Sequence, residues 1–438
     1  MCRATPFIRV SILLAVLFIS LYGCKSTDLN EFPDDEINSD IVADPSIRPS
    51  TINAEVFLDA TTSMSGYAQD PNGTYIKFIS ELEAAVAFGT RNSTINYYKF
   101  GTQVKQINRN EAVFQSKAFY REKGIFERTS IDSVLVRADE AKSTIILTDL
   151  FQSEGDINQI VEQFKTRCFS KGLDVGILMV PAEFNGIVYD AKVAPFKYSS
   201  TQADINTYRP FYAIFVGKAP DFLHLIDALK STAVKDVVLD DNIILLRKQV
   251  VYGYEVKMEK NKDPQYRKVS QRWISRGYSG KNPFKNIFRV TLSRGEKPVP
   301  IVVTIDNIRP AKYLPEINLN NIDIEVIKMG TTKEQISSND EFQTVECSSE
   351  GSKITLNLLY NPKFEGKSSS YKMLYGVSAL RGFKVPEAFT QYSSLNPNPT
   401  SDANKTLNLE KFVTDLIRTY MSINTGYIAK SYLYLDYK

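Results

Sequence analysis

The residues best suited to chemistry are oxygen donors that follow two apolar runs. Asp59, Thr61 and Ser63 come directly after the run that ends at Leu58, within the stretch VFLDATTSMSGY. Asp149 closes a second run, STIILTD. Carboxylates and hydroxyls are the ligands that Mg²⁺ and Mn²⁺ prefer in proteins. If the two runs lie side by side, this pattern indicates a site for a divalent cation.

Groups for enzymatic chemistry are scarce in the sequence. The chain has one histidine, His224, so no second histidine is present for a Ser or Cys triad. His224 lies within DFLHLIDAL, where a packing role on a helix is favoured. Ser369 and Lys372 have the spacing of a Ser/Lys nucleophile pair, but they lie in EGKSSSYK, which is predicted to be a polar loop. We therefore expect no enzyme, with an unrecognised hydrolase as the remote alternative.

The elements that must position the oxygen donors lie within residues 53–233, where strand-like and helix-like segments alternate. The strand-like runs cover residues 55–58, 95–100, 144–148, 175–180 and 211–216. Such alternation predicts an α/β doubly wound (Rossmann-like) domain with a parallel sheet covered on both faces. Sites in these sheets form outside the carboxyl ends of the strands, where both aspartates would lie. The segment 181–210 is predicted to be irregular, and it either lines the site or contacts the next domain.

Three stretches resemble a known family. Asp59, Thr61 and Ser63 match the Asp-x-Ser/Thr-x-Ser signature of von Willebrand factor type A domains. The stretch ERTSIDSVL resembles the segment that carries the metal-site threonine of this family, which gives that role to Thr129. The stretch ILTD resembles the strand end that carries the second aspartate, Asp149. The resemblance therefore implies a metal-ion-dependent adhesion site (MIDAS).

The resemblance also implies how such a site works. The hydroxyls of Thr61, Ser63 and Thr129 would contact Mg²⁺ or Mn²⁺, while Asp59 and Asp149 would hold the waters of the ion. An acidic side chain of a protein partner would then complete the coordination shell.

Two alternatives to this site stay open. Thr129 could serve only as the cap of a helix that begins at Ile131. The whole domain could also keep the type A fold while its metal site is vestigial. One departure from the family pattern is Leu150, which stands where many members have glycine.

From residue 234 onward the sequence pattern changes. Residues 234–395 contain short apolar or alternating runs separated by Gly, Pro, Asn and Lys, which predicts an all-β, sandwich-like domain that acts as a spacer or second contact surface. Residues 396–438 are predicted to form a polar linker, an amphipathic helix and a closing strand. The apolar residues of the helix, from Leu409 to Tyr420, have helical spacing. Packing in the protein core is favoured over a membrane or partner surface.

The N-terminal residues predict an exported protein. Residues 1–23 carry two arginines and then an apolar run, as in a signal peptide that is removed. The run ends in LYGC, which resembles the lipobox of bacterial lipoproteins and implies lipid attachment at Cys24. Residues 24–52 are rich in Asp and Glu and are predicted to be a solvated tether. These features imply lipid anchoring in a bacterial cell envelope, with the outer membrane expected and its periplasmic and surface faces both open.

Charge and cysteine content restrict the partner little. The formal net charge is +3, and loss of the two arginines in residues 1–23 leaves it near zero. The stretch 247–289 is basic and aromatic, but the exported address argues against nucleic acid; a solvated β face is favoured over contact with lipid, polysaccharide or an acidic protein. Cys168 and Cys347 are predicted either to pair in a disulfide or to remain free thiols.

The sequence as a whole predicts a lipid-anchored binding protein that uses a Mg²⁺-bound (or Mn²⁺-bound) MIDAS to capture an acidic residue of a protein partner. The alternative is a metal-independent structural or assembly component of a cell-envelope complex.

Overall fold

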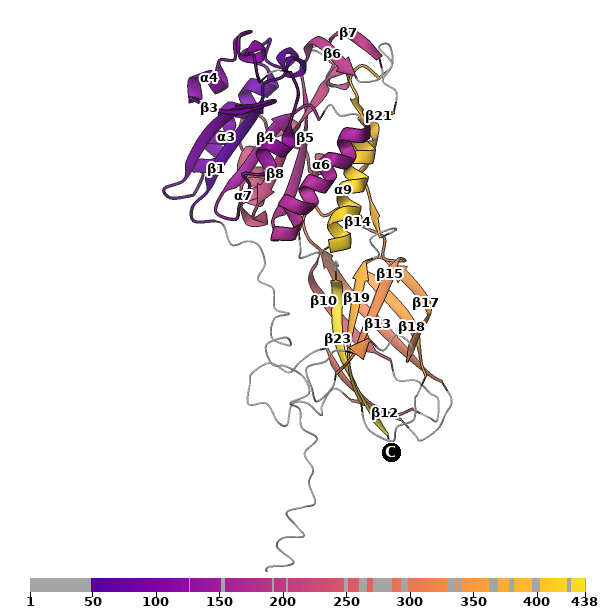
Figure 1. Cartoon of the computed structure of the whole chain (residues 1–438). Coiled ribbons are helices and arrows are strands. Elements are labelled where there is room, and N and C mark those ends of the chain that lie inside the picture. Colours follow the sequence, from indigo (N-terminus) through magenta and orange to yellow (C-terminus); the bar gives the residue numbers. More distant parts are fainter. Residues whose placement is uncertain are drawn as a thin grey trace, which may run out of the picture.

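The computed structural model describes residues 49–437 with gaps, and the chain forms an α/β part and a β-rich part (Figure 1). The gaps are residues 126, 151–153, 191–192, 202–203, 248–250, 260–265, 271–285, 293–297, 330–335, 338–340, 362–368, 378–381, 396–401 and 424–426. Cys24, the predicted signal peptide and most of the predicted tether therefore lie outside the described residues. Much of the basic stretch 247–289 lies outside them as well.

A seven-stranded sheet forms the centre of the α/β part, with the strand order β3-β2-β1-β4-β8-β5-β9. The bounds are β1 (Asn53–Asp59), β2 (Thr94–Phe100), β3 (Val104–Ile107), β4 (Ser143–Thr148), β5 (Asp174–Ala182), β8 (Arg209–Gly217) and β9 (Ile243–Leu246). Strand β1 pairs in parallel with β2 and β4, whereas the other pairings in this sheet are antiparallel. The α/β character is therefore confirmed, but the predicted parallel sheet is wrong because the sheet is mixed.

The antiparallel half arises because β8 lies between β4 and β5 and pairs antiparallel with both. Every residue of β8 is buried, as expected for a central strand covered on both faces. A run of this kind has the same apolar pattern beside parallel or antiparallel neighbours, so the pattern alone could not distinguish the two arrangements.

The connection from β5 to β8 has its own secondary structure, which corrects the predicted irregular segment 181–210. It contains the antiparallel hairpin β6 (Asn185–Asp190) and β7 (Val193–Ser199) and the 3-10 helix η5 (Ile205–Thr207). This hairpin lies at the end of the α/β part that is remote from the β-rich part (Figure 1).

Helices cover both faces of the seven-stranded sheet, as predicted. They are α3 (Thr74–Ala87), α4 (Arg109–Val113), α5 (Ile131–Leu135), α6 (Glu154–Arg167), α7 (Ala219–Leu229) and α9 (Leu409–Ile423). Because side chains alternate along a strand, Val56 and Leu58 of β1 share one core with α3 and α7, whereas Phe57 shares the opposite core with α5, α6 and α9. The short 3-10 helices are η2 (Thr62–Gly66), η3 (Phe119–Arg121), η4 (Phe169–Lys171), η6 (Lys235–Val237) and η7 (Asp240–Asn242).

Segments beyond residue 233 complete the α/β part. Strand β9 is the edge strand next to β5, although its sequence was predicted to belong to the β region. The predicted amphipathic helix is α9, and it lies beside α6 with its apolar side in the core (Figure 1). The rings of Phe169 and Tyr420 meet edge to face at 4.9 Å between centroids. Core packing of this helix is thereby confirmed.

The β-rich part consists of two main sheets that share one apolar core. A four-stranded sheet contains β10 (Val251–Met258), β13 (Val299–Pro310), β17 (Phe342–Glu350) and β18 (Lys353–Tyr360), and a six-stranded sheet contains β11 (Tyr266–Ser270), β12 (Ile287–Leu292), β15 (Ile322–Met329), β16 (Ile336–Ser337), β19 (Ser369–Val377) and β23 (Tyr427–Tyr437). Of the short elements, β14 (Glu316–Ile317) pairs with β20 (Phe383–Lys384), whereas α8 (Glu387–Gln391), β21 (Ser393–Ser394) and β22 (Thr406–Leu407) lie against the α/β part, where α8 and β21 contact α9. In β18 buried residues alternate with more exposed ones, which is typical of a sheet with one face on a core. The β-rich character predicted for this region is therefore confirmed.

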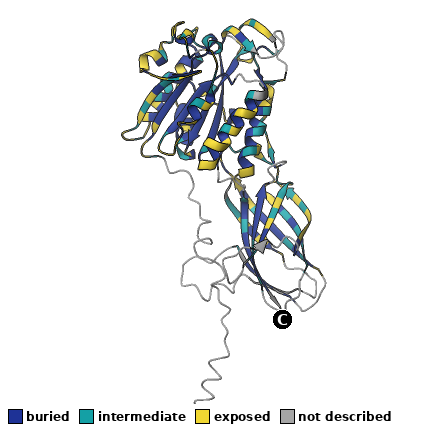
Figure 2. Cartoon of the chain, viewed as in Figure 1, coloured by how far each residue is buried: buried dark blue, intermediate teal, exposed yellow. Residues whose placement is uncertain are grey.

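The strands of the seven-stranded sheet are mostly buried, whereas the helices and loops around them include exposed residues (Figure 2). His224 is buried beside the ring of Phe88, in keeping with a packing role. Ser369 begins strand β19, so the predicted loop is wrong at this position. Cys168 and Cys347 are both free thiols. No helix among the described residues is long and apolar enough to span a membrane.

Candidate functional site

The candidate site lies where two neighbouring parallel strands end. Asp59 is the last residue of β1, and Asp149 follows the last residue of β4. The register pairs Leu58 with Leu147, so the two strands end level with each other. Both carboxylates are buried, with 0% of Asp59 and 3% of Asp149 exposed. The expectation that the two runs lie side by side is therefore confirmed.

The turn after β1 folds back onto the Asp59 carboxylate. The backbone N–H of Thr61 donates a hydrogen bond to Oδ1 of Asp59 at 3.0 Å, and the Thr61 hydroxyl donates to the same atom at 2.6 Å. The Ser63 hydroxyl lies 3.2 Å from the Thr61 hydroxyl. Met64, fully buried in the core, anchors the 3-10 helix η2 that carries Ser63. The alternation of small polar residues with a buried Met thus keeps the hydroxyls at the sheet edge.

Thr129 reaches the site from a segment distant in the sequence. Its hydroxyl donates to Oδ2 of Asp59 at 3.1 Å and lies 3.2 Å from the Thr61 hydroxyl. Its neighbour Ser130 occupies the N-cap position of α5 without a side-chain capping hydrogen bond. The alternative that Thr129 serves only as a helix cap is therefore wrong, because its hydroxyl contacts the carboxylate.

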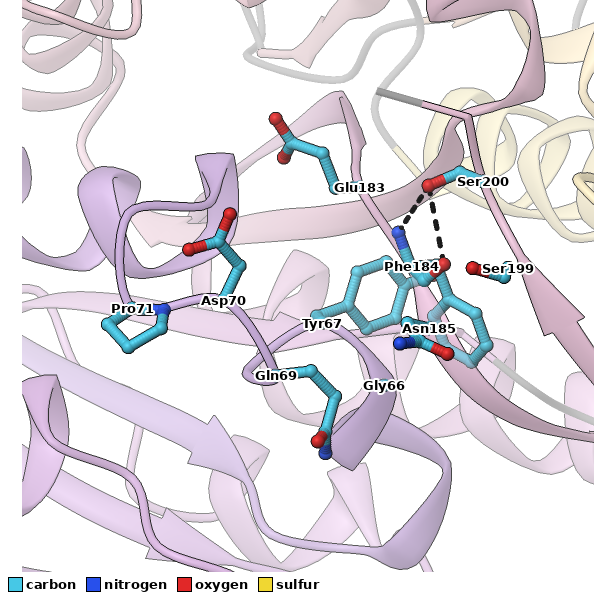
Figure 3. Close-up of a pocket in the computed structure, with 10 residues that line it drawn as sticks. All are labelled: Gly66, Tyr67, Gln69, Asp70, Pro71, Glu183, Phe184, Asn185, Ser199 and Ser200. Atoms are coloured by element: carbon cyan, nitrogen blue, oxygen red, sulfur yellow. Dashed lines mark hydrogen bonds between the residues drawn. The ribbon is translucent and has the colours of Figure 1, made fainter. Parts of the chain in front are cut away.

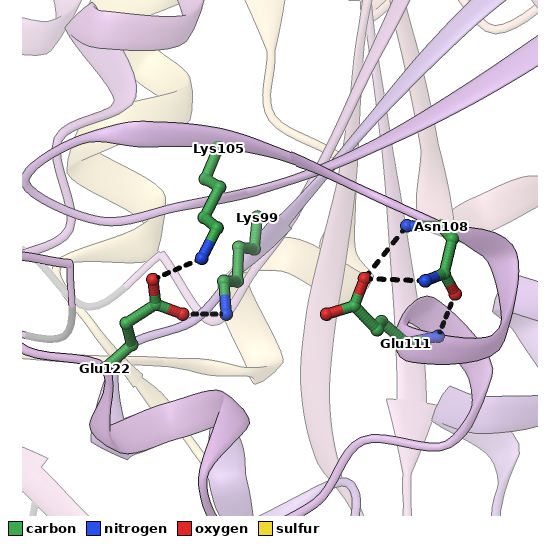
Figure 4. Close-up of polar contacts among 5 residues, drawn as sticks. All are labelled: Lys99, Lys105, Asn108, Glu111 and Glu122. Carbon is green, nitrogen blue, oxygen red and sulfur yellow. Dashed lines mark hydrogen bonds and ion pairs between the residues drawn. The ribbon is translucent and has the colours of Figure 1, made fainter.

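The segment that carries Thr129 is held on the sheet by Gly101 and by an ion-pair cluster. A Cβ atom on Gly101 would lie 1.8 Å from the carbonyl oxygen of Ile125, so only glycine permits this contact. Glu122 pairs with the buried Lys99 and, at 2.6 Å, with Lys105 (Figure 4). Hydrogen bonds from Lys105 and Lys99 lower the pKa of Glu122, so this anchor is ionised at neutral pH.

A nearby cap fixes the chain just after β3. Asn108 and Glu111 form a reciprocal capping box at the start of α4, in which the Asn108 side chain accepts from the Glu111 backbone N–H and the Glu111 carboxylate accepts from the Asn108 backbone N–H (Figure 4).

Sequence reasoning missed one residue of the site, Thr148. This residue is fully buried, and its hydroxyl donates to Oδ2 of Asp59 at 2.8 Å. The same hydroxyl oxygen accepts a hydrogen bond from the backbone N–H of Leu150 at 3.3 Å. Leu150 has φ of +51°, the left-handed region where glycine is usual. The sequence signal was the threonine directly before the aspartate in ILTD.

The candidate site holds two buried carboxylates whose negative charges repel each other. Burial, and secondly the charge of Asp149, raise the pKa of Asp59 from 3.8 to about 6, while hydrogen bonds from Thr61 and Thr148 act in the opposite direction. Among the described residues, no basic side chain forms an ion pair with Asp59. A bound cation would reduce this repulsion between two buried carboxylates.

The donor set also matches a particular class of ion. Within the described residues there is no cluster of three or more His, Cys, Asp or Glu side chains that could hold a metal. The candidate site has two carboxylates and four nearby hydroxyls, those of Thr61, Ser63, Thr129 and Thr148. An all-oxygen set with few negative charges fits Mg²⁺ or Mn²⁺, which keep part of their water shell, better than it fits Zn²⁺.

The residue after η2 is linked through the start of β8 to a segment near the C-terminal end of the chain. The Tyr67 hydroxyl donates to the carbonyl oxygen of Pro210 at 2.7 Å. The buried Arg209 donates from Nη1 to the carbonyl oxygens of Ala403 and Lys405, both at 2.7 Å. The site is therefore built on packed elements from both halves of the sequence.

In comparisons with known proteins, no family model matches this chain, and no curated protein matches it.

Proposed function

We propose that this protein is an exported, lipid-anchored binding protein whose α/β part captures an acidic residue of a protein partner through a divalent cation. The observation that carries the proposal is the cluster of Thr61, Ser63 and Thr129 hydroxyls beside the buried carboxylate of Asp59, with the buried carboxylate of Asp149 close enough to raise the pKa of Asp59. The resemblance of these residues to the MIDAS of von Willebrand factor type A domains supports the same function.

Each residue has a defined part in this proposal. Thr61, Ser63 and Thr129 would hold Mg²⁺ or Mn²⁺ through their hydroxyls, while Asp59 and Asp149 would orient its waters and balance its charge. When bound, the cation supplies an electrophilic centre for a carboxylate. Because hydroxyls are neutral donors, the protein leaves most of the cation charge available to the acidic residue of the partner. The surrounding buried residues keep the donors in place before the partner arrives.

The remaining parts of the chain would serve presentation. Cys24 would carry the lipid that attaches the protein to the bacterial cell envelope, with the outer membrane as the expected membrane. The β-rich part would act as a spacer or a second contact surface. The site edge carries the β6–β7 hairpin, which lies away from the β-rich part, so a partner would approach from that end (Figure 1). We expect no nucleic acid partner and no enzymatic turnover.

Calorimetric titration of Mg²⁺ and Mn²⁺ into the metal-stripped protein tests the proposal. Saturable binding is expected in the native chain and in Ser130→Ala, a control that removes a hydroxyl adjacent to Thr129. Binding should be lost in Asp59→Ala and strongly weakened in Thr129→Ala. Partner capture should then be abolished by chelation. Equal metal binding by all four proteins would overturn the assignment of the site.

One observation favours the alternative, metal-independent docking in an envelope complex. Hydrogen bonds from Thr61, Thr129 and Thr148 already satisfy the Asp59 carboxylate within the protein. A vestigial site would use these bonds only to hold the sheet edge together. In that case the native chain would take up no cation, and partner capture would be indifferent to chelation and to Asp59→Ala.

A further inference from the structure

A pocket of about 410 Å³ lies beside the candidate metal site (Figure 3). Gly66 and Tyr67, at the end of η2, form one part of its wall together with Phe184. The loop from Gln69 to Pro71 and the ends of the β6–β7 hairpin complete the lining. Because η2 also carries Ser63, the pocket and the candidate metal site share one helical turn.

The hairpin and this turn are packed as one unit. A Cβ atom on Gly186 would lie 2.8 Å from Cα of Gly66, and one on Gly66 would lie 2.4 Å from the ring of Phe184. A side chain at position 186 would meet the backbone of η2 and force the two segments apart, whereas one at position 66 would displace the ring of Phe184. The backbone N–H of Phe184 also donates to the Ser200 hydroxyl at 2.9 Å (Figure 3). The pocket is therefore a preformed hollow at a fixed position relative to Ser63.

The polar lining of the pocket is acidic. It contains the carboxylates of Asp70 and Glu183 and no lysine or arginine. A Cβ atom on Gly73 would lie 3.4 Å from Cβ of Asp70 and 3.7 Å from Oε2 of Glu183, so the two side chains are neighbours. In Figure 3 both lie on the side of the pocket opposite Ser199.

The two pocket carboxylates carry negative charges that have no basic partner among the described residues. Burial acts to raise the pKa of Glu183, but hydrogen bonds, chiefly from the backbone N–H of Thr74, outweigh it and lower the pKa. Oε2 of Glu183 accepts that N–H at 2.8 Å, and its Oε1 accepts from the Tyr208 hydroxyl at 3.3 Å. Oδ1 of Asp70 accepts the N–H of Asn72 at 2.9 Å.

The spacing between pocket and metal site suits one extended peptide. Ser63 and Gly66 are three residues apart in a 3-10 helix, which rises about 2 Å per residue, so they are roughly 6 Å apart along its axis. An extended chain advances about 3.3 Å per residue. A side chain two or three positions from the metal-bound acidic residue would therefore reach the pocket.

We propose that this pocket binds a lysine or arginine side chain of the same protein partner whose acidic residue completes the metal shell. The inference rests on the proposed function and adds a recognition rule to it. The rule requires a basic residue two or three positions from the acidic residue in the segment that binds. A hydrophobic or acidic neighbour at that distance would leave the two pocket carboxylates without a counter-charge.

Selection from a library of random displayed peptides tests the rule. Peptides are bound to the full-length protein in Mg²⁺ and eluted with EDTA. We expect enrichment of Asp or Glu with Lys or Arg two or three positions away. The double variant Asp70→Asn/Glu183→Gln should keep the acidic preference and lose the basic one. Glu350→Gln, which removes one exposed negative charge in the β-rich part, should keep both.

A binding cycle then measures the effect. For one selected peptide, replacing its basic residue with glutamine should weaken binding to the native chain about fivefold, and should have no effect on the double variant. Because Glu183 also holds the start of α3, Asp70→Asn alone is the second test if the double variant fails to fold.

The possible failures are distinguishable. EDTA-eluted peptides that share an acidic residue but no basic one would overturn the pocket assignment and leave the proposed function standing. Peptides whose basic preference survives in both pocket variants would also overturn it. If EDTA elutes no peptides at all, the proposed function is overturned, and this inference with it.

Discussion

Two buried carboxylates, one in each part of the molecule, are handled in opposite ways. In the β-rich part, Glu341 is paired with Lys328 at 3.1 Å and accepts a hydrogen bond from the hydroxyl of Tyr371. In the α/β part, Asp59 accepts hydrogen bonds from hydroxyls, and a second carboxylate lies close enough to raise its pKa. One negative charge is thus balanced within the protein, whereas the other faces a second negative charge.

The difference identifies which carboxylate is available for function. A buried ion pair such as that of Glu341 is complete in itself, so its removal should damage the fold locally and nothing else. Two adjacent buried carboxylates cost folding free energy unless a cation or a proton joins them. A strained polar cluster of this kind is typical of functional sites rather than of structural ones.

The largest effect is expected from replacing Asp59 and, in a separate variant, Glu341 with alanine. Asp59→Ala should reduce Mg²⁺ affinity by at least about a hundredfold, because it removes the centre of the donor network. Glu341→Ala should leave Mg²⁺ affinity unchanged and lower the free energy of unfolding by about 3 kcal/mol, since Lys328 loses its buried partner. Calorimetry and urea unfolding on both variants measure this pair of effects. A loss of metal affinity in Glu341→Ala would remove the distinction between the two parts.

A second prediction concerns the segment that brings Thr129 to the site. Gly101→Ala should lower the free energy of unfolding by about 3 kcal/mol and weaken Mg²⁺ binding, because the added methyl group would displace the carbonyl of Ile125. Gly253→Ala is the control, since its Cβ would make only ordinary contact, at 3.6 Å, with a side-chain carbon of Arg309. Thermal unfolding and metal titration of both variants are the measurements. Equal behaviour of the two would show that Gly101 does not position Thr129.

The third prediction is a pH dependence of the metal-free protein. The pKa of Asp59 is raised from 3.8 to about 6 in the folded state, so the protonated form is favoured there. The stability from this group is therefore present below about pH 4 and is lost as the pH rises through about 6, by about 2 to 3 kcal/mol. Urea unfolding in EDTA should show this loss in the native chain and a flatter profile in Asp59→Asn. Saturating Mg²⁺ should abolish the loss, whereas identical profiles for both chains would contradict it.

The sequence predicts features that depend on neighbouring residues better than features that depend on the path of the whole chain. Asp59 and Thr61 are close in the chain, so a local pattern was enough to predict that both belong to one site. The pairing of β1 with β4 followed from apolar runs that end in aspartates. By contrast, the antiparallel insertion of β8 depends on the path of the chain through the hairpin, and no local period encodes that path.

Long-range packing explains the other errors. β9 and α9 lie after the predicted boundary at residue 233, yet both complete the α/β part. β9 pairs with β5 at the edge of the sheet, and the apolar face of α9 packs in one core with α6. The pocket carboxylates Asp70 and Glu183 are distant in the sequence, so nothing in either stretch indicated that they meet. Thr148 stands directly before Asp149 in ILTD, but its contact with Asp59 depends on the pairing of β1 with β4.

Thr148 provides the smallest and most specific prediction. Thr148→Val keeps the shape of the side chain but removes the hydroxyl that holds Asp59 at 2.8 Å and accepts from Leu150 at 3.3 Å. We expect about a tenfold loss of Mg²⁺ affinity, because a hydrogen bond of this kind orients the carboxylate that serves the metal. Thr148→Ser, which keeps a hydroxyl, should restore the affinity. Thr144 lies on the same strand, equally buried, with a hydroxyl that contacts no other polar group among the described residues. Thr144→Val should therefore leave Mg²⁺ affinity unchanged, and an equal loss in both valine variants would show that the effect comes from the strand and not from the site.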